Sequence, residues 1–138
     1  MKRRVSNAFI YAFEFPESNS AKIISLINNN QIEAVISERV LKEVHIYFKR
    51  YYDKELAATF RDYLLRTCTV IFHADVKKEM RRYKAQIKDK DLEQLAVVKK
   101  LGIKFLLAYD RDFKGFEEYI TPKAFLKQIG IKPDPSDY

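Results

Sequence analysis

The chain has 138 residues, of which 47% are hydrophobic and 33% are charged, and this composition excludes a disordered tail or a collagen-like repeat. The length suits one domain with a single core, so we expect one domain over residues 1–138. Lys and Arg number 26 against 19 Asp and Glu, and the net charge of +7 would attract a phosphate backbone. A solvated Lys-rich surface explains that charge equally well.

No apolar segment approaches the roughly 20 residues that span a bilayer, and the basic start Met1–Arg4 is not followed by a signal-peptide core. We therefore expect a cytoplasmic protein with no membrane segment. The single cysteine, Cys68, cannot form an internal disulfide. Its β-branched neighbours indicate a strand, so we expect its side chain to be packed inside the fold.

Apolar periodicity and cap residues predict the elements in chain order. The first half should contain a helix from the cap region 18–20 to 28–30, a strand at 34–36, a helix capped by Ser37 that reaches Tyr51, a helix around 56–64 and a strand at 69–72. The second half should contain a helix capped by Asp75 that ends near Ala85, a helix from about Asp91 to Gly102, a strand at 105–108, a short piece at 119–120 and a helix opened by Thr121 and Pro122. Strands that alternate with helices imply an α/β fold in which helices cover both faces of a parallel sheet.

Four carboxylates stand near the ends of these elements. Asp110 and Asp112 directly follow the strand at 105–108, and ligands of open α/β sheets bind beyond the carboxyl ends of the strands. Asp91 lies near the first turn of the preceding helix, and Glu43 borders the apolar face of its own helix, so both could reach the same edge. Convergent carboxylates suit Mg²⁺ or Mn²⁺. Two such ions can cleave a phosphodiester, one by activating a water and the other by steadying the leaving oxygen.

Each acid also has an ordinary structural interpretation. Asp91 can cap its helix, Asp110 and Asp112 can be turn residues, and Glu43 can be a solvated helix residue. The joint pattern favours a site, because separate elements would otherwise have to aim acids at one edge by accident.

The motifs occur in an order typical of one protein family. Residues 37–44 carry an acid at Glu43, an acidic block follows over 91–96, 101–102 and 107–113, and residues 120–126 read as a last strand and helix. On these residues the chain resembles the PIN-domain family, many of whose members are Mg²⁺- or Mn²⁺-dependent ribonucleases and several of which are toxins of toxin–antitoxin pairs.

The resemblance implies a three-layer α/β/α domain with a central parallel sheet of about five strands. It also implies metal ligands at Glu43, Asp91, Asp110 and Asp112, RNA as the substrate, and an antitoxin-like protein or a second copy of the chain as a further partner. The beginning of the chain departs from the family. The family's first strand usually ends in Asp-Thr-Asn or Asp-Ser-Asn, and the matching segment here is Arg4–Ala12.

Val5 stands where the first metal-binding Asp is expected, whereas Ser6 and Asn7 match the remaining polar positions and could support the site. A neutral amide cannot replace the charge of a bridging carboxylate. Two functions therefore stay open: a metal-dependent endoribonuclease, and a catalytically degenerate module that binds RNA or a protein partner. A small-molecule enzyme is not favoured, because no Gly-rich phosphate loop follows any predicted strand.

A basic stretch precedes Asp91, and it could hold an RNA backbone while Tyr83 stacks on a base. The cations concerned are Lys77, Lys78, Arg81, Arg82 and Lys84. A solvated cationic helix face explains the same stretch.

Other aromatic and imidazole side chains have less specific interpretations. Phe48 and Tyr51 fall in the apolar stripe of the helix after Ser37, where core packing or a dimer contact is expected. His45 and His73 show no metal-like spacing, so we assign both to the surface or to packing.

Overall fold

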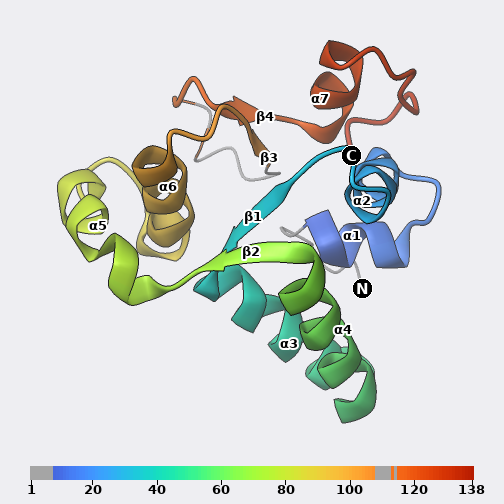
Figure 1. Ribbon diagram of the computed structural model, residues 1–138, viewed down its shortest axis with the longest axis horizontal. Helices are drawn as coiled ribbons and strands as arrows, with labels where there is room; N and C mark the ends of the chain where they lie inside the picture. The colour runs from blue at the N-terminus through green and yellow to red at the C-terminus, as the bar shows by residue number, and fades with distance from the viewer. Residues whose placement is uncertain (1–7, 108–112, 114) are drawn as a thin grey trace. The chain divides into compact units, whose positions relative to one another are not determined.

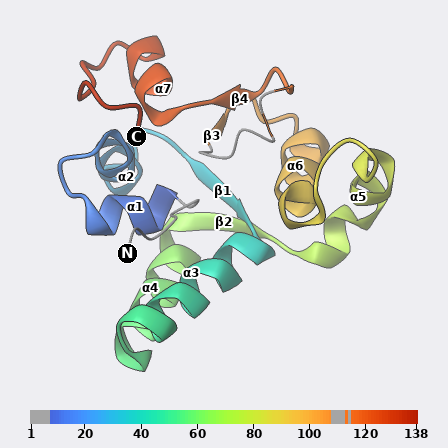
Figure 2. The same cartoon turned by 180° about the vertical axis from the view of Figure 1, so that it is seen from behind.

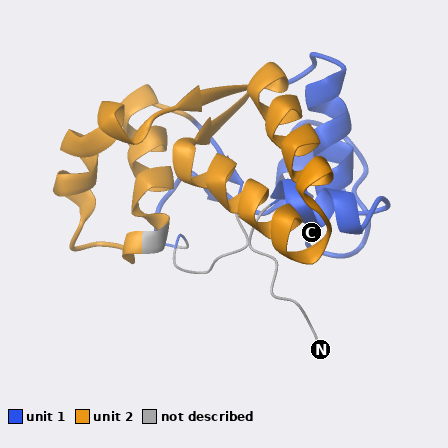
Figure 3. Cartoon of the chain, turned by 90° about the horizontal axis from the view of Figure 1, so that it is seen from below, with its two compact units in different colours: residues 1–32, 104–138 blue, residues 33–103 orange. Residues whose placement is uncertain are grey.

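A computed structural model describes residues 8–107, 113 and 115–138 (Figure 1). The first half contains α1 (Ala8–Glu14), α2 (Asn19–Asn28), β1 (Ala34–Ser37), α3 (Glu38–Tyr51), α4 (Lys54–Thr67) and β2 (Cys68–Ile71). The second half contains the 3₁₀ helix η1 (His73–Val76), α5 (Lys77–Tyr83), α6 (Asp89–Leu101), β3 (Leu106–Leu107), β4 (Tyr119–Ile120) and α7 (Pro122–Gln128). The chain divides into two compact units: residues 33–103, called the middle unit below, and residues 1–32 with 104–138, called the terminal unit (Figure 3).

The middle unit is built on the parallel strands β1 and β2, which pair from Ala34 opposite Cys68 to Ser37 opposite Ile71. The chain between them forms the helical hairpin α3–α4, and both views show these helices side by side (Figures 1 and 2). The fully buried Phe48 stacks on Phe60 with 4.2 Å between ring centroids. The predicted packing role of Phe48 is confirmed.

Tyr51 does not share that role, because it is 48% exposed as the last residue of α3 and its ring lies on Tyr47. Core packing was therefore the wrong expectation for Tyr51, and a dimer contact stays a prediction.

A small apolar core joins α6 to η1 and the strands. Its buried residues are Val76, Ala96 and Val97, and Val35, Ile71, Met80 and Ile103 pack against them. The helix α6 is buried on more than one face, since Leu92, Leu95, Val97 and Val98 are all at most 4% exposed. This packing brings the first turn of α6 close to the first turn of α3.

Several predicted caps are present. The hydroxyls of Ser18, Ser37 and Thr121 accept hydrogen bonds from the backbone N–H groups three residues later, at 3.1, 3.2 and 3.3 Å. Gly102 ends α6 with a φ of +64°, a conformation that favours glycine. The hydrogen bonds and the backbone angle confirm these predictions. They were possible from the sequence because each cap depends only on neighbouring residues.

The cap predicted at Asp75 is wrong. Asp75 lies inside the 3₁₀ helix η1, which contains the residues predicted to begin a longer α-helix. No side chain caps η1 or α5. The helix α5 therefore begins at Lys77 and ends at Tyr83, before the predicted end near Ala85.

The terminal unit contains α1, α2 and α7 with the parallel strands β3 and β4, which pair Leu106 with Tyr119 and Leu107 with Ile120. The helix α1 occupies positions 8–14, so residues 8–12 of the segment matched to the family's first strand are helical. Val5, Ser6 and Asn7 lie outside the described residues, as does Ala108 at the end of the predicted strand 105–108.

Helices and parallel strands confirm the α/β class, but a central sheet of about five strands is not confirmed. The strands that the structure describes form two parallel pairs, one in each unit. The three-layer arrangement and the single domain over residues 1–138 stay predictions. In the described ranges, no helix has the length and apolar character needed to cross a membrane.

Cys68 begins β2 and is partly buried. Burial raises the pKa of its thiol, and a contact with the Thr67 hydroxyl partly offsets that effect. This environment agrees with the packed position expected for Cys68, and the raised pKa disfavours the reactive thiolate.

Candidate functional site

Asp91 is the third residue of α6, so it lies in the first helical turn as expected. It is not the N-cap, because Lys88 occupies that position without a side-chain cap. Its side chain is buried, with 8% of the residue exposed. The partial positive charge at the start of α6 offsets part of the cost of burying a carboxylate there.

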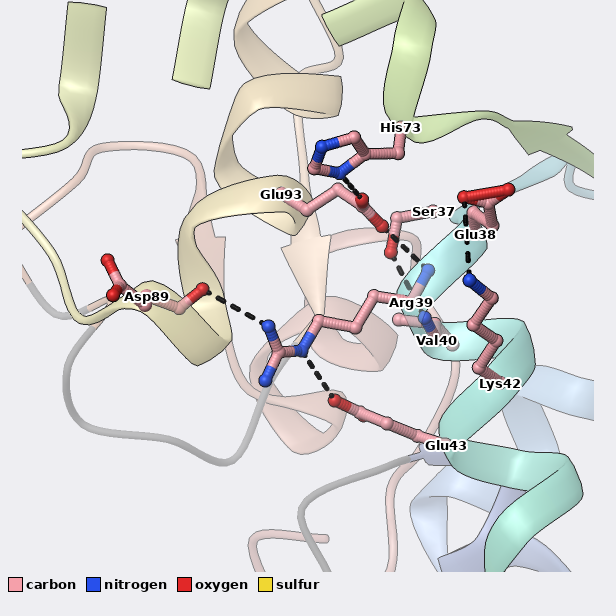
Figure 4. Close-up of polar contacts among 9 residues, drawn as sticks. All are labelled: Ser37, Glu38, Arg39, Val40, Lys42, Glu43, His73, Asp89 and Glu93. Atoms are coloured by element: carbon pink, nitrogen blue, oxygen red, sulfur yellow. Dashed lines mark hydrogen bonds and ion pairs between the residues drawn. The ribbon is translucent and has the colours of Figure 1, made fainter. Parts of the chain in front are cut away.

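Glu43 lies one turn after Arg39 on α3, and its Oε1 is 3.3 Å from the Arg39 Nε (Figure 4). The same guanidinium donates from Nη1 to the backbone carbonyl of Asp89 at 3.3 Å. Arg39 therefore links Glu43 to the first turn of α6, the turn that also carries Asp91. The two side chains of the Arg39–Glu43 pair are 45% and 43% exposed, so the pair contributes at most about 1 kcal/mol to stability.

The remaining predicted ligands, Asp110 and Asp112, lie outside the described residues. Within residues 8–107, 113 and 115–138, no group of three or more His, Cys, Asp or Glu side chains is arranged to hold a metal ion. Of the four predicted ligands, the described part of the chain therefore supplies Glu43 and Asp91.

Glu93 is a buried carboxylate that the sequence did not single out, and it is only 4% exposed. Its Oε2 accepts a hydrogen bond from the backbone N–H of Arg39 at 2.6 Å, and its Oε1 lies 2.6 Å from Nδ1 of His73 (Figure 4). Both oxygens are thus engaged, one by the first turn of α3 and the other by η1. With the carboxylate ionised, the His73 ring donates from Nδ1.

We assigned His73 to the surface or to packing and did not predict its contact with Glu93. A signal was available in the sequence: Glu93 sits between Leu92 and Leu95 in a helix that also places Val97 on the face of Glu93. An acid on an apolar face requires a partner when it is buried.

A cleft of about 430 Å³ lies beside this network in the middle unit. Its lining comes from α3, η1, α5 and α6 together with the residue after α5: Arg39, His73, Lys77, Met80, Arg81, Lys84, Asp89 and Leu92. Three of the cations predicted to bind RNA line the cleft, namely Lys77, Arg81 and Lys84. Lys78 and Arg82 are not part of the lining.

Tyr83, which was expected to stack on a base, does not belong to the cleft lining either. Its ring is contacted by two cations, with the Arg82 guanidinium carbon and the Lys99 Nζ each 5.8 Å from the ring centroid. The ring therefore takes part in contacts between α5 and α6.

A sequence profile described as the PIN domain matches residues 6–112. The chain belongs to the PIN-domain family. The match runs from Ser6 to Asp112 and so includes all four predicted acids of this PIN domain. Membership indicates nuclease-type activity in general, with RNA as the suggested substrate and a general dependence on divalent metal. Neither the curated proteins nor the solved structures include a match to the chain.

Proposed function

We propose that this PIN domain is an Mg²⁺- or Mn²⁺-dependent endoribonuclease whose ions are held by Glu43, Asp91, Asp110 and Asp112, with Ser6 and Asn7 in support. The observation that carries the proposal is the family match over residues 6–112, which contains the four acids. A toxin-like role, an antitoxin-like partner, a homodimer and a cytoplasmic location belong to the same proposal and rest on the family resemblance.

The donor set suits the proposed ions, because carboxylate oxygens are the ligands that Mg²⁺ and Mn²⁺ prefer. Such an ion would supply positive charge that activates a water molecule and stabilises charge on the phosphate. Asp91 would contribute a buried carboxylate fixed by the first turn of α6. Glu43 would exchange its exposed contact with Arg39 for the ion, and the weakness of that surface pair makes the exchange easy.

Cleavage of a labelled single-stranded RNA in Mn²⁺ tests the proposal. We expect Asp110→Asn and Asp91→Asn to reduce cleavage by about 100-fold or more. Mutation of residues that only support the metal ligands already lowers metal affinity or activity roughly 10- to 100-fold. Asp62→Asn is the control, since Asp62 is an exposed acid on α4 that is neither a proposed ligand nor part of the cleft lining. Equal residual cleavage by the wild type and Asp110→Asn would point to a contaminant and refute the proposal.

Glu43 has its own matched control in Glu38, because each forms an i,i+4 ion pair on α3. Glu43 pairs with Arg39 at 3.3 Å, and Glu38 pairs with Lys42 at 3.9 Å. Both Gln variants should lose only about 0.5 kcal/mol of stability. Only Glu43→Gln should reduce cleavage, and an equal effect of both variants would remove Glu43 from the proposed site.

A second candidate function is a catalytically degenerate module that binds RNA or a protein partner, and the observation that favours it is Val5 in place of the first acid. Binding of RNA with a steep salt dependence and without Mn²⁺-dependent cleavage would support this candidate over the enzyme.

A further inference from the structure

We propose that the cleft lined by Arg39, His73, Lys77, Met80, Arg81, Lys84, Asp89 and Leu92 binds single-stranded RNA, with phosphates on its cations and one base against Met80. The inference deepens the proposed function, on which it rests for RNA as the substrate class. Lys77, Arg81 and Lys84 line the cleft, whereas Lys78 and Arg82 do not. The sequence alone could not distinguish these two groups.

The cations of α5 are spaced for one face of the helix. Lys77, Arg81 and Lys84 follow one another at i, i+4 and i+7. Lys84 keeps helical backbone angles as the residue after α5, so the row extends about 10 Å along the axis. All three side chains belong to exposed residues, and they can therefore reach phosphates without a large desolvation cost.

Arg39 adds a positioned cation from α3, another element of the cleft lining. Its guanidinium donates to the Asp89 carbonyl at 3.3 Å, a contact that does not involve Glu43. In the absence of a metal ion it also contacts the Glu43 carboxylate at 3.3 Å. The backbone N–H of Arg39 is held by buried Glu93 at 2.6 Å. Guanidinium groups can contact phosphate oxygens through two donors at once, so this position suits a phosphate.

The charge balance of the lining favours an anion. Four Lys and Arg side chains and one carboxylate, Asp89, line the cleft. Arg39 also pairs with Glu43 outside the lining, so the excess positive charge comes mainly from Lys77, Arg81 and Lys84. His73 adds a further polar group: its Nδ1 is engaged by Glu93 at 2.6 Å, and Nε2 is the ring nitrogen that this contact does not use.

The size and the apolar part of the lining favour a single strand. A volume of about 430 Å³ is in the range of small-ligand sites and suits one nucleotide rather than a duplex. Met80 is partly exposed and offers an adaptable apolar surface to a base, above the buried Leu92.

Two matched double variants of the full chain test the inference. Lys77→Ala with Arg81→Ala removes two cleft cations, and Lys78→Ala with Arg82→Ala removes one Lys and one Arg at the same spacing on α5 outside the cleft. Binding of a fluorescein-labelled single-stranded RNA is measured by anisotropy in EDTA over a range of salt concentrations. Because each lost phosphate contact lowers the salt slope by about 0.7 for single strands, the cleft pair should lower it by about 1.4 and weaken binding about 25-fold near 0.1 M salt. The control pair should change the affinity by less than about threefold.

The outcomes separate the inference from its competitors. Equal weakening by the two pairs would overturn it, because general surface charge would then account for binding. Equal affinity for duplex RNA would overturn the single-stranded assignment. Displacement of the RNA by polyglutamate as readily as by unlabelled RNA would instead assign the cleft to an acidic protein partner.

Folding and catalysis are controlled separately. Far-UV circular dichroism and urea midpoints check both pairs, and if the cleft pair unfolds, the single variant Lys84→Ala should still weaken RNA binding about fivefold. An unchanged affinity of Lys84→Ala in that case would overturn the inference. Because binding is measured in EDTA, loss of Mn²⁺-dependent cleavage leaves this result unaffected: binding at the cleft without cleavage would refute only the proposed enzyme, and cleavage without cleft binding would refute only this inference.

Discussion

Glu93 shows how one buried charge can organise several elements. Its carboxylate receives the Arg39 N–H from α3 and contacts His73 in η1, both at 2.6 Å, from a position in α6 that is 4% exposed. Hydrogen bonds to a charged group are worth about 1.5–3 kcal/mol each. Glu93 thereby positions Arg39 and His73, two residues of the cleft lining.

Removal of this carboxylate should be costly. We expect Glu93→Ala to lower the free energy of unfolding by about 2–4 kcal/mol, because the Arg39 N–H and the His73 ring lose a charged hydrogen-bond partner. Glu93→Gln should cost less, because an amide oxygen can still accept the Arg39 N–H. Urea denaturation measures both variants, and Glu55→Ala is the control because Glu55 is an exposed acid in the first turn of α4.

If Glu93→Ala lowers the free energy of unfolding no more than Glu55→Ala does, Glu93 does not hold these elements together. A double-mutant cycle with His73→Ala isolates the contact, for which we expect a coupling energy of about 1–2 kcal/mol.

At the scale of elements, α2 holds the segment that follows α7, and Asn19 makes three of the hydrogen bonds between them. Asn19 is fully buried, and its Nδ2 donates to the carbonyls of Asp134 and Ser136 at 3.1 and 2.6 Å. Its Oδ1 accepts the Asp134 N–H at 2.6 Å. The Asp134 carboxylate in turn accepts from the hydroxyl and N–H of Ser136, and these bonds lower the pKa of Asp134.

Asn19→Ala should therefore loosen the segment that follows α7 around Asp134 and Ser136. We expect the free energy of unfolding to fall by about 2–4 kcal/mol. Three hydrogen bonds are lost at roughly 1 kcal/mol each, and the backbone groups they engaged are left without a partner. Urea denaturation measures the stability, and hydrogen exchange should accelerate at Asp134. Asn29→Ala, which changes an exposed Asn just after α2, is the control. Unchanged exchange at Asp134 in Asn19→Ala would argue against this anchoring role.

At the scale of the whole molecule, the proposed metal site of this PIN domain depends on Val5, the residue at the position where the resemblance to the family leads us to expect an Asp. The profile match covers residues 6–112 and so begins just after Val5, the position at which the family's first Asp is expected. The proposed metal site would therefore bind its ions with fewer charged ligands than is usual in the family, and charge count is a main determinant of affinity for hard cations.

Val5→Asp should restore the missing charge. We expect metal affinity, and with it cleavage at limiting Mn²⁺, to rise about tenfold or more. Single residues around a metal site typically change affinity or activity by at least this factor. Calorimetric titration with Mn²⁺ and cleavage at several Mn²⁺ concentrations measure the effect. Val5→Asn introduces a side chain of the same shape without the charge, and it should not produce the gain. A Val5→Asp variant that matches the wild type in both measurements would show that the first acid is not the missing element.

The order of the acids, the helices α2 to α7 and several of their ends were predictable from the sequence, whereas α1 occupies a segment that had been matched to a strand. Ser37 and Thr121 cap α3 and α7 through bonds to residues three positions later, and Gly102 ends α6 with its own backbone angle. Such features are readable because they depend on neighbours in the chain. The family resemblance was readable for a related reason: it rests on residue types in order and needs no knowledge of packing.

The pairing of charges depends on how the elements pack, which the sequence does not reveal. The burial of Glu93, its contacts with His73 and Arg39, and the division between Lys77 with Arg81 and the neighbouring Lys78 with Arg82 depend on how α3, η1, α5 and α6 pack. Periodicity places cations on the faces of a helix but does not say which face borders a cleft, because that depends on contacts between residues far apart in the chain. The cleft beside Glu93 is therefore a property of the packed middle unit.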